Sequence, residues 1–419
     1  MKNKSNVINL GCRLNSYESR IIENILDKNK ISNTTVINTC AVTNQAVQKS
    51  RSEIRKAKKR NPNNSIIVTG CASHIEPFFF KKMPEVERVV DNKVKTQEVF
   101  YKKNFNNLIS EVDTKLQQFP KDVDAFSTKT RALLQIQQGC DHRCTFCIIP
   151  FGRGNSISLP LGEIVKRTED IINYGYSEIV ITGVDITSYG HDLPGKPPLG
   201  QILKRLLKIV PKITRLRLSS IDPAEIDEDL LDLIINEPKL MPHIHFSVQS
   251  GNNLILKRMK RRHTREDIIN ICKYIKIRRH EMTFGADFIV GFPTETEEFF
   301  MESIDCIEKC QFSNLHIFPF SPKKGTPASK MPQIKKILKT QRASLMKSVG
   351  YKIKENLIKK KISSVVKILF ECEKLSYTND YFKVRVEGIP RSKNKFLRGQ
   401  LVDVKLENYS DDVIFGKIL

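Results

Sequence analysis

Three closely spaced cysteines constrain this chain more than any other feature. Cys140, Cys144 and Cys147 have the spacing C-x3-C-x2-C, and the apolar residues 133–137 before them predict a buried strand. Three thiolates on one loop suit a cubane iron-sulfur cluster whose fourth iron has no protein ligand. Tetrahedral zinc would need a fourth ligand, and His142 lies between the cysteines at a spacing unlike that of common zinc sites. The motif therefore favours a cluster-binding loop after a strand, with zinc as the alternative.

Strand and helix patterns alternate after the cysteine loop. Apolar, β-rich runs predict strands at 178–182, 214–219, 243–249, 283–290 and 313–320. Helical patterns lie between them, at 161–174, 201–210, 226–235, 265–278 and 296–309. Together with the strand before the cysteines, successive right-handed βαβ units of this kind predict an incomplete parallel barrel. Barrel enzymes keep their chemistry in the loops after the strands, where the cysteines lie.

The amino-terminal part of the chain holds a second set of three cysteines. Cys12, Cys40 and Cys71 each lie just beyond a short apolar run, at 7–10, 36–38 and 66–69. These runs predict parallel strands, and in an open α/β sheet the carboxyl ends of such strands converge on one crevice. Three cysteines at one sheet edge favour a second cluster over core filling. The remaining cysteines, which we expect to be buried thiols without a role, are Cys272, Cys306, Cys310 and Cys372.

The carboxyl-terminal residues predict a small β-barrel. A long basic helical pattern at 334–361, which could simply be a solvated helix, comes first. Short alternating strands follow, predicted at 365–370, 382–386, 399–406 and 413–419.

The charge balance indicates a polyanionic partner. Seventy Lys and Arg residues against 46 Asp and Glu give a formal net charge of +24, which favours nucleic acid binding. An AT-biased genome would explain part of the lysine excess but not the arginine clusters. We expect nucleic acid contacts from basic and aromatic side chains, namely Arg51, Arg55, Arg261, Arg262, Tyr381, Lys383 and Arg385.

Targeting signals are lacking in the sequence. No apolar run approaches the ~18 residues of a membrane span, and Met1 to Leu10 lack the apolar core of a signal peptide. The expected location is therefore the cytoplasm, without membrane contact.

The cysteine loop resembles that of the radical SAM superfamily, with Phe146 in the aromatic position of C-x3-C-x-aromatic-C. The resemblance implies that the open iron of a 4Fe-4S cluster binds S-adenosylmethionine. An electron from the reduced cluster then breaks a carbon-sulfur bond and releases a 5′-deoxyadenosyl radical. Arg217 is one of several strand polar residues that could line such a site. The expected S-adenosylmethionine contacts are Phe146, Thr182, Gly183, Asp185, Ser219, Gln249 and Asp287.

Two three-cysteine sets in this order resemble the radical SAM methylthiotransferase family over nearly the full chain. In that family an auxiliary 4Fe-4S cluster supplies or holds the inserted sulfur. The resemblance thus implies two 4Fe-4S clusters and two molecules of S-adenosylmethionine per turnover. The stretches 38–44, 49–51, 285–293 and 318–321 are similar to the MtaB type, which acts on N6-threonylcarbamoyladenosine beside the tRNA anticodon. Where the family has further arginines, this chain has Ile157 and Leu159, so contacts of those arginines are not carried over.

The resemblance also implies a domain organisation and partners. We expect an α/β chain with an open parallel sheet domain carrying the auxiliary cluster (1–100), a linker (101–130), a partial (β/α)6 radical SAM barrel (131–350) and a small OB-like β-barrel that resembles a TRAM RNA-binding domain (355–419). Expected partners are the anticodon stem-loop of tRNA and an electron donor such as flavodoxin or ferredoxin, with the chain a monomer.

Other functions stay open at this point. Isopentenyladenosine in tRNA and an aspartate of a ribosomal protein are alternative substrates. A different class of protein is also open, a non-catalytic, redox-sensing iron-sulfur protein that binds RNA.

Overall fold

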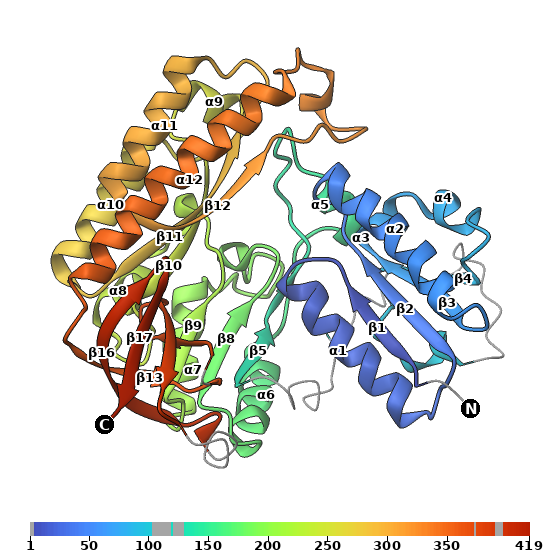
Figure 1. Ribbon diagram of the computed structural model, residues 1–419, viewed down its shortest axis with the longest axis horizontal. Helices are drawn as coiled ribbons and strands as arrows, with labels where there is room; N and C mark the ends of the chain where they lie inside the picture. Colours follow the sequence, from blue (N-terminus) through green and yellow to red (C-terminus); the bar gives the residue numbers. More distant parts are fainter. Residues whose placement is uncertain (1–3, 103–118, 120–129, 373, 390–396) are drawn as a thin grey trace. The chain divides into compact units, whose positions relative to one another are not determined.

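The computed structural model describes residues 4–102, 119, 130–372, 374–389 and 397–419 (Figure 1). The chain divides into two compact units. The first comprises the described part of Met1–Ser127 together with Gln138–Ile157 and Ser321–Ser329, and the second comprises the rest of the described chain. Both cysteine sets therefore belong to the first unit, although 138–157 lies within the expected barrel domain in sequence. Most of the expected linker, 101–130, lies outside the described residues.

A four-stranded parallel sheet forms the centre of the first unit, in the order β1-β2-β3-β4. Its strands are β1 (Asn6–Asn9), β2 (Thr34–Thr39), β3 (Ser65–Gly70) and β4 (Arg88–Val89). All six residues of β2 are buried, as expected for a strand with neighbours on both sides. The open parallel sheet predicted from the sequence is thus confirmed. The two-residue strand β4 was not predicted, because it is too short to show a periodic pattern.

Two long helices cover this sheet, and shorter helices follow the strands. In α1, Leu14, Ile21 and Ile25 recur at helical spacing and are buried. The second long helix begins where the Thr43 hydroxyl accepts a hydrogen bond from the backbone N–H of Ala46 (3.1 Å). The helices of this unit are α1 (Arg13–Lys28), α2 (Asn44–Arg60), α3 (Cys71–Ile75), α4 (Pro77–Lys81), the 3-10 helix η1 (Glu98–Tyr101) and α5 (Ile149–Arg153).

Six parallel strands in the second unit form the partial barrel predicted from the sequence. They form two three-stranded sheets, which are linked where the N–H of Ile221 donates to the carbonyl of His245 (2.9 Å). The first strand spans 131–135 rather than 133–137, because Gln137 already belongs to the short strand β6, which pairs with β7. The strands are β5 (Arg131–Gln135), β8 (Glu178–Thr182), β9 (Arg215–Leu218), β10 (His243–Gln249), β11 (Thr283–Val290) and β12 (Phe312–Pro319), with β6 (Gln137–Gln138) and β7 (Ile157–Ser158) beside them.

Helices follow the barrel strands close to the predicted ranges. The N-cap of α10 is a capping box, in which the Thr264 hydroxyl and the Asp267 carboxylate each accept a backbone N–H. The seven-residue helix α9 was not predicted. None of the helices in the described ranges combines the length and apolar character of a bilayer-spanning helix. The helices and 3-10 turns are α6 (Leu161–Asn173), η5 (Ile186–Ser188), α7 (Leu199–Ile209), η6 (Pro223–Glu225), α8 (Glu228–Asn236), α9 (Asn253–Met259), α10 (Arg265–Arg278) and α11 (Glu297–Cys310). The 3-10 helix η7 (Pro327–Lys330) belongs largely to the first unit.

The long basic helix α12 (Lys336–Lys359) is a packed element rather than a merely solvated one (Figure 1). It lies along β12, where a Cβ on Gly350 would approach the side chain of Leu315 to 2.5 Å. Arg342 is buried and forms an ion pair with Glu295 (2.8 Å). The helix therefore covers the last strand of the barrel.

The carboxyl-terminal strands close into the predicted small β-barrel, in the order β13-β14-β15-β17-β16. Its apolar core includes Ile368, Phe382, Val404 and Ile414. The three-residue strand β14 was missed. The strands are β13 (Val365–Leu369), β14 (Ser376–Thr378), β15 (Lys383–Glu387), β16 (Leu401–Ser410) and β17 (Val413–Ile418).

Candidate functional site

The amino-terminal cysteines gather at one edge of the first sheet. Cys40 and Cys71 directly follow β2 and β3, and Cys12 lies three residues after β1. Burial raises the pKa of the Cys40 thiol, and the nearby Cys71 and Cys12 raise it further. Three thiolates at such a place need a compensating positive charge, and an iron-sulfur core supplies one. The donor set therefore fits a metal cluster.

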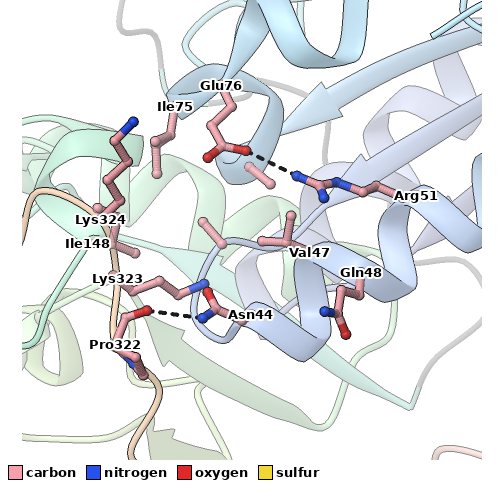
Figure 2. A pocket seen from close by; sticks show the side chains of 12 residues that line it. Asn44, Val47, Gln48, Arg51, Ile75, Glu76, Ile148, Pro322, Lys323 and Lys324 are labelled. Atoms are coloured by element: carbon pink, nitrogen blue, oxygen red, sulfur yellow. Dashed lines mark hydrogen bonds and ion pairs between the residues drawn. The ribbon is translucent and has the colours of Figure 1, made fainter. Parts of the chain in front are cut away.

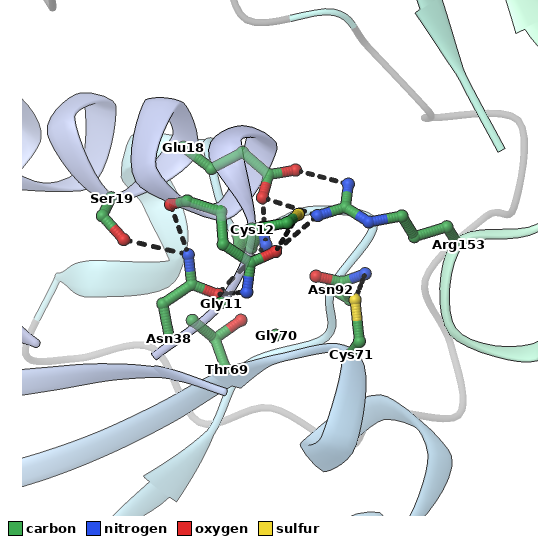
Figure 3. Close-up of polar contacts among 12 residues, drawn as sticks. Gly11, Cys12, Glu18, Ser19, Asn38, Thr69, Gly70, Cys71, Asn92 and Arg153 are labelled. Carbon is green, nitrogen blue, oxygen red and sulfur yellow. Dashed lines mark hydrogen bonds and ion pairs between the residues drawn. The ribbon is translucent and has the colours of Figure 1, made fainter. Parts of the chain in front are cut away.

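A buried ionic network lies beside these cysteines (Figure 3). The carboxylate of Glu18 accepts two hydrogen bonds from Arg153 (2.9 and 3.0 Å) and lies 2.5 Å from the ammonium of Lys95. Burial opposes ionisation of Glu18, but Arg153 and Lys95 outweigh it and lower the pKa of the carboxyl. Two cations against one carboxylate leave a net positive charge next to three thiols. This charge suits an anionic cluster-thiolate assembly.

Sequence reasoning missed Glu18 and Lys95. A signal was present, because Asn15 and Glu18 occupy the apolar face of α1 next to Cys12, where a buried polar residue needs a partner. Asn15 donates to the carbonyl of Thr39 (2.9 Å), and Arg153 donates to Asn15 (2.6 Å). Lys95 could not be identified in this way, because the sequence around it does not indicate that its side chain is buried.

The other three cysteines, all half-buried, lie on a loop whose backbone shape is closely determined. The N–H of Cys140 donates to the carbonyl of Gly154 (3.1 Å), and the N–H of Cys147 donates to that of Cys144 (3.0 Å). Gly139 has φ +73°, and a Cβ there would lie 1.9 Å from the carbonyl oxygen of Asn155. Three thiols held on one loop fit three ligands of a cubane cluster. Phe146 lies on this loop.

Residues just after this loop pack against the amino-terminal cysteines. A Cβ on Gly152 would lie 3.2 Å from the Cβ of Cys71. The Asn92 amide donates to the carbonyl of Gly152 (2.7 Å). The ion pair of Arg153 with Glu18 is a second link. The first unit therefore brings the surroundings of the two cysteine sets together.

The second unit carries the other expected S-adenosylmethionine contacts. Thr182 ends β8, and Gly183 follows it with the side chain of Gln137 packed closely against its backbone. The Gln137 side-chain oxygen accepts the N–H groups of Val184 (2.9 Å) and Asp185 (2.8 Å). This turn thus has a defined shape that a Cβ on Gly183 would disturb.

Three further residues from this group lie on or just after the next strands, Ser219 directly after β9, Gln249 on β10 and Asp287 on β11. The buried hydroxyl of Ser219 has no hydrogen-bond partner among the described residues, and Gln249 ends β10 with a left-handed φ of +72°. An unpaired polar group and a strained backbone are features that a ligand site explains. Burial opposes ionisation of Asp287, but hydrogen bonds from His245 (2.9 Å) and His316 (3.0 Å) lower its pKa to about 2. Sequence reasoning missed both histidines.

The residues expected to contact RNA differ widely in exposure. Arg55 and Arg385 are exposed. Arg51 lies 3.5 Å from Glu76. Arg261 is buried against Asp222 (2.9 Å), whereas Arg262 is exposed despite its ion pair with Glu225 (2.9 Å). The exposed arginines remain the predicted RNA contacts.

Tyr381 packs between the two barrels of the second unit. Its ring stacks on His243 and on Tyr377, with 5.0 Å between centroids in each pair. Arg217 was expected to line a ligand site, but it forms an ion pair with Glu178 (2.7 Å) and lies over the Tyr381 ring. Lys383 forms an ion pair with Asp412 (2.7 Å). These contacts give Tyr381 and Arg217 a packing role.

The remaining cysteines are outside both cysteine sets. Cys272, Cys306 and Cys310 are buried on α10 and α11, as expected. The expectation was wrong for Cys372, which is exposed because the turn between β13 and β14 faces solvent.

Comparison with known proteins defines the class first. Residues 134–307 match the model of the Radical SAM superfamily, and residues 4–91 match a family described as Uncharacterized protein family UPF0004. The fold resembles that of the radical S-adenosylmethionine methyltransferase TsrM from Kitasatospora setae, with a TM-score of 0.56 and 13% identity over 78% of this chain and 77% of that one. The fold and the cysteine loop are those of a radical SAM enzyme, whose cofactors are a 4Fe-4S cluster and S-adenosylmethionine.

Sequence relatives define the family. The chain is 43% identical to the threonylcarbamoyladenosine tRNA methylthiotransferase MtaB of Rickettsia prowazekii, over 92% of this chain and 91% of that protein. It is 33% identical to the protein of that name from Bacillus subtilis (95% and 92%). It is 30% identical to a tRNA-2-methylthio-N(6)-dimethylallyladenosine synthase of Wolbachia pipientis wMel (98% and 95%). The chain belongs to the radical SAM methylthiotransferase family.

Proposed function

We propose that this enzyme converts N6-threonylcarbamoyladenosine next to the tRNA anticodon into its 2-methylthio derivative. The observation that carries the proposal is the presence of two cysteine triads in one compact unit. Inserting sulfur at an unactivated carbon needs both a sulfur source and a radical source at the same atom. The named relatives at 43% and 33% identity support the choice of substrate.

Cys140, Cys144 and Cys147 would hold the cluster that, when bound, reduces S-adenosylmethionine to generate the radical. Gly139 and the backbone bonds of the loop keep the three thiols in one arrangement. On the barrel, Gly183, Ser219, Gln249 and Asp287 are the proposed contacts to S-adenosylmethionine. An electron donor such as flavodoxin or ferredoxin would supply the electron to a monomeric enzyme.

Cys12, Cys40 and Cys71 would hold a second 4Fe-4S cluster. Lys95 and Arg153 would balance the negative charge of that assembly, because Glu18 neutralises only one of the two cations.

Exposed arginines of each unit are the proposed RNA contacts. Arg55 on α2 and Arg385 on β15 would contact tRNA phosphates, in keeping with the formal charge of +24. The small β-barrel would be the RNA-binding module, and residues 1–100, 131–350 and 355–419 the three functional domains.

The test is mass spectrometry of nucleosides from tRNA incubated with anaerobically reconstituted enzyme, reductant and S-adenosylmethionine. Parallel reactions contain tRNA with threonylcarbamoyladenosine or with isopentenyladenosine. We expect the 2-methylthio product only from the former, and its loss in Cys144→Ala. The matched control, Cys372→Ser, changes an exposed cysteine outside both triads and should leave product formation intact.

Other outcomes would contradict the proposal in different ways. If only the tRNA with isopentenyladenosine gave a 2-methylthio product, isopentenyladenosine would be the substrate instead of threonylcarbamoyladenosine. Release of 5′-deoxyadenosine without either product would reject the proposed substrate. It would still show that the enzyme cleaves S-adenosylmethionine to a radical. Absence of 5′-deoxyadenosine would favour a non-catalytic iron-sulfur protein.

A further inference from the structure

A small pocket in the first unit is lined in part by residues that follow cysteines of both triads in the sequence (Figure 2). It has a volume of about 330 Å³. Three of its lining residues, Ala41, Ala72 and Ile148, directly follow Cys40, Cys71 and Cys147. The pocket therefore lies beside the places where the sulfur source and the radical source would be held. A volume near the lower end of ligand pockets, about 300 Å³, suits a substituent rather than a whole nucleotide.

The charge of the pocket is positive. Arg51, Lys323 and Lys324 contribute three cations to its lining, and Glu76 contributes one carboxylate. Glu76 pairs with Arg51 (3.5 Å), as Figure 2 shows. Neither Lys323 nor Lys324 forms an ion pair with this carboxylate. An anion is the complementary occupant.

Lys323 is the informative residue of this pocket, because its side chain is only 6% exposed. No ion pair or hydrogen bond of its ammonium is found among the described residues. Cys40 and Glu76 lie close enough to interact with the charge of Lys323, but neither forms an ion pair with it. A buried ammonium without an ion-pair partner is costly, and a bound carboxylate would satisfy it.

The rest of the lining offers apolar contact and amide groups. Val47, Ile75 and Ile148 are the apolar part. The Asn44 amide donates to the carbonyl of Pro322 (3.0 Å), which holds its side-chain oxygen as an acceptor next to the pocket. A group that combines a carboxylate with hydroxyl and amide donors matches this lining better than a hydrocarbon does.

We propose that this pocket binds the carboxylate-bearing N6 substituent of the substrate adenosine, with Lys323 and Arg51 as specificity-determining residues. This inference rests on the proposed function and adds the residues that select the substrate. On adenine, N6 is attached to C6, and C6 and C2 both flank N1, so a substituent held here keeps C2 near both triads. A neutral isopentenyl group would leave Lys323 buried and unpaired, which disfavours that substrate.

Binding of anticodon stem-loop RNA to the full-length, reconstituted protein tests the pocket. Two RNAs are compared, identical except that one carries the threonylcarbamoyl group and the other an unmodified adenosine. We expect the wild type to prefer the modified RNA at least about tenfold, the scale of one hydrogen bond to a charged group. Lys323→Met should abolish the preference while leaving the affinity for unmodified RNA and the iron content unchanged. Arg51→Gln should reduce the preference.

The matched control is Lys59→Met, which removes an exposed cation from the same helix as Arg51. It should change the affinity for both RNAs by the same factor and keep the preference. A preference that survives in Lys323→Met would overturn the inference. Loss of about four irons per chain in that variant would also overturn it, because Lys323 would then serve the cluster.

The failure of this inference can be told apart from the failure of the proposed function. If the wild-type enzyme forms the 2-methylthio product and Lys323→Met still prefers the modified RNA, only the assignment of the pocket is rejected. A wild type with neither preference nor product rejects both.

Discussion

The carboxylate of Glu18 lies 2.9 Å from the guanidinium of Arg153, and each residue stands six positions beyond a triad cysteine, Cys12 and Cys147 respectively. The pair therefore joins the two cysteine-bearing segments at a buried point (Figure 3). A structural defect at this pair should affect both segments.

Glu18→Gln should destabilise the first unit even without iron. The substitution leaves Lys95 and Arg153 buried without a carboxylate, and removing one member of a buried ionic group costs about 3–5 kcal/mol. Thermal melting of the iron-free protein should show a lower Tm. The control is Glu23→Gln, whose surface pair with Arg20 contributes about 0–1 kcal/mol. Equal Tm values for the two variants would contradict the role of the network.

Each cysteine triad should account for about four irons per chain. Replacing Cys12, Cys40 and Cys71 by Ala should halve the iron and sulfide content of the reconstituted protein and abolish product, while 5′-deoxyadenosine release continues. Replacing Cys140, Cys144 and Cys147 should halve the iron and abolish that release. Iron content unchanged by the first replacement would show that the amino-terminal triad holds no cluster.

Gly183→Ala should impair cleavage of S-adenosylmethionine. A Cβ would lie 2.8 Å from the Gln137 side-chain oxygen that accepts two N–H groups of this turn. We expect 5′-deoxyadenosine release to fall by about tenfold or more with unchanged iron content, as for the loss of an interaction of about 1.4 kcal/mol. Gly162→Ala, on the open side of α6, has nothing within 4 Å and should have normal activity. Full activity in Gly183→Ala would show that this turn does not belong to the S-adenosylmethionine site.

Glu178→Gln should lower the Tm at neutral pH but much less in acid. Burial opposes ionisation of Glu178, yet Arg217, Arg131 and Arg215 outweigh it and lower its pKa from 4.5 to about 2. The carboxylate therefore stabilises the fold fully above about pH 4.5, and this contribution is lost as the pH falls through about 2. The Tm difference between wild type and variant should narrow over that window.

The control for this pH dependence is Glu163→Gln, a half-exposed carboxylate 3.9 Å from Arg167. The Tm of this variant should follow that of the wild type at every pH, because a half-exposed carboxylate 3.9 Å from its partner contributes little to stability. A Tm difference for Glu178→Gln that stays constant between pH 4.5 and 2 would show that the carboxylate acts through packing alone.

The sequence by itself determined the architecture and the cysteine triads. The strands at 178–182, 243–249 and 283–290 were predicted to the residue, because hydrophobic periodicity is local and these runs are bounded by clear turns. The spacing of Cys140, Cys144 and Cys147 is likewise local. The sequence misplaced the first barrel strand and missed β14, because pairing with a neighbouring strand decides where these short strands begin and end.

Only the tertiary structure decided what surrounds the triads. Lys95 reaches Glu18 across 77 positions, and Lys323 lies near Cys40 across 283, distances at which no periodic pattern connects two residues. Arg217 and Tyr381 likewise contact each other across the two barrels of the second unit, although 164 positions separate them in the sequence. The physical reason is that a charged side chain shows its role only when its burial and its partners are known, and both arise from the packing of segments remote in sequence.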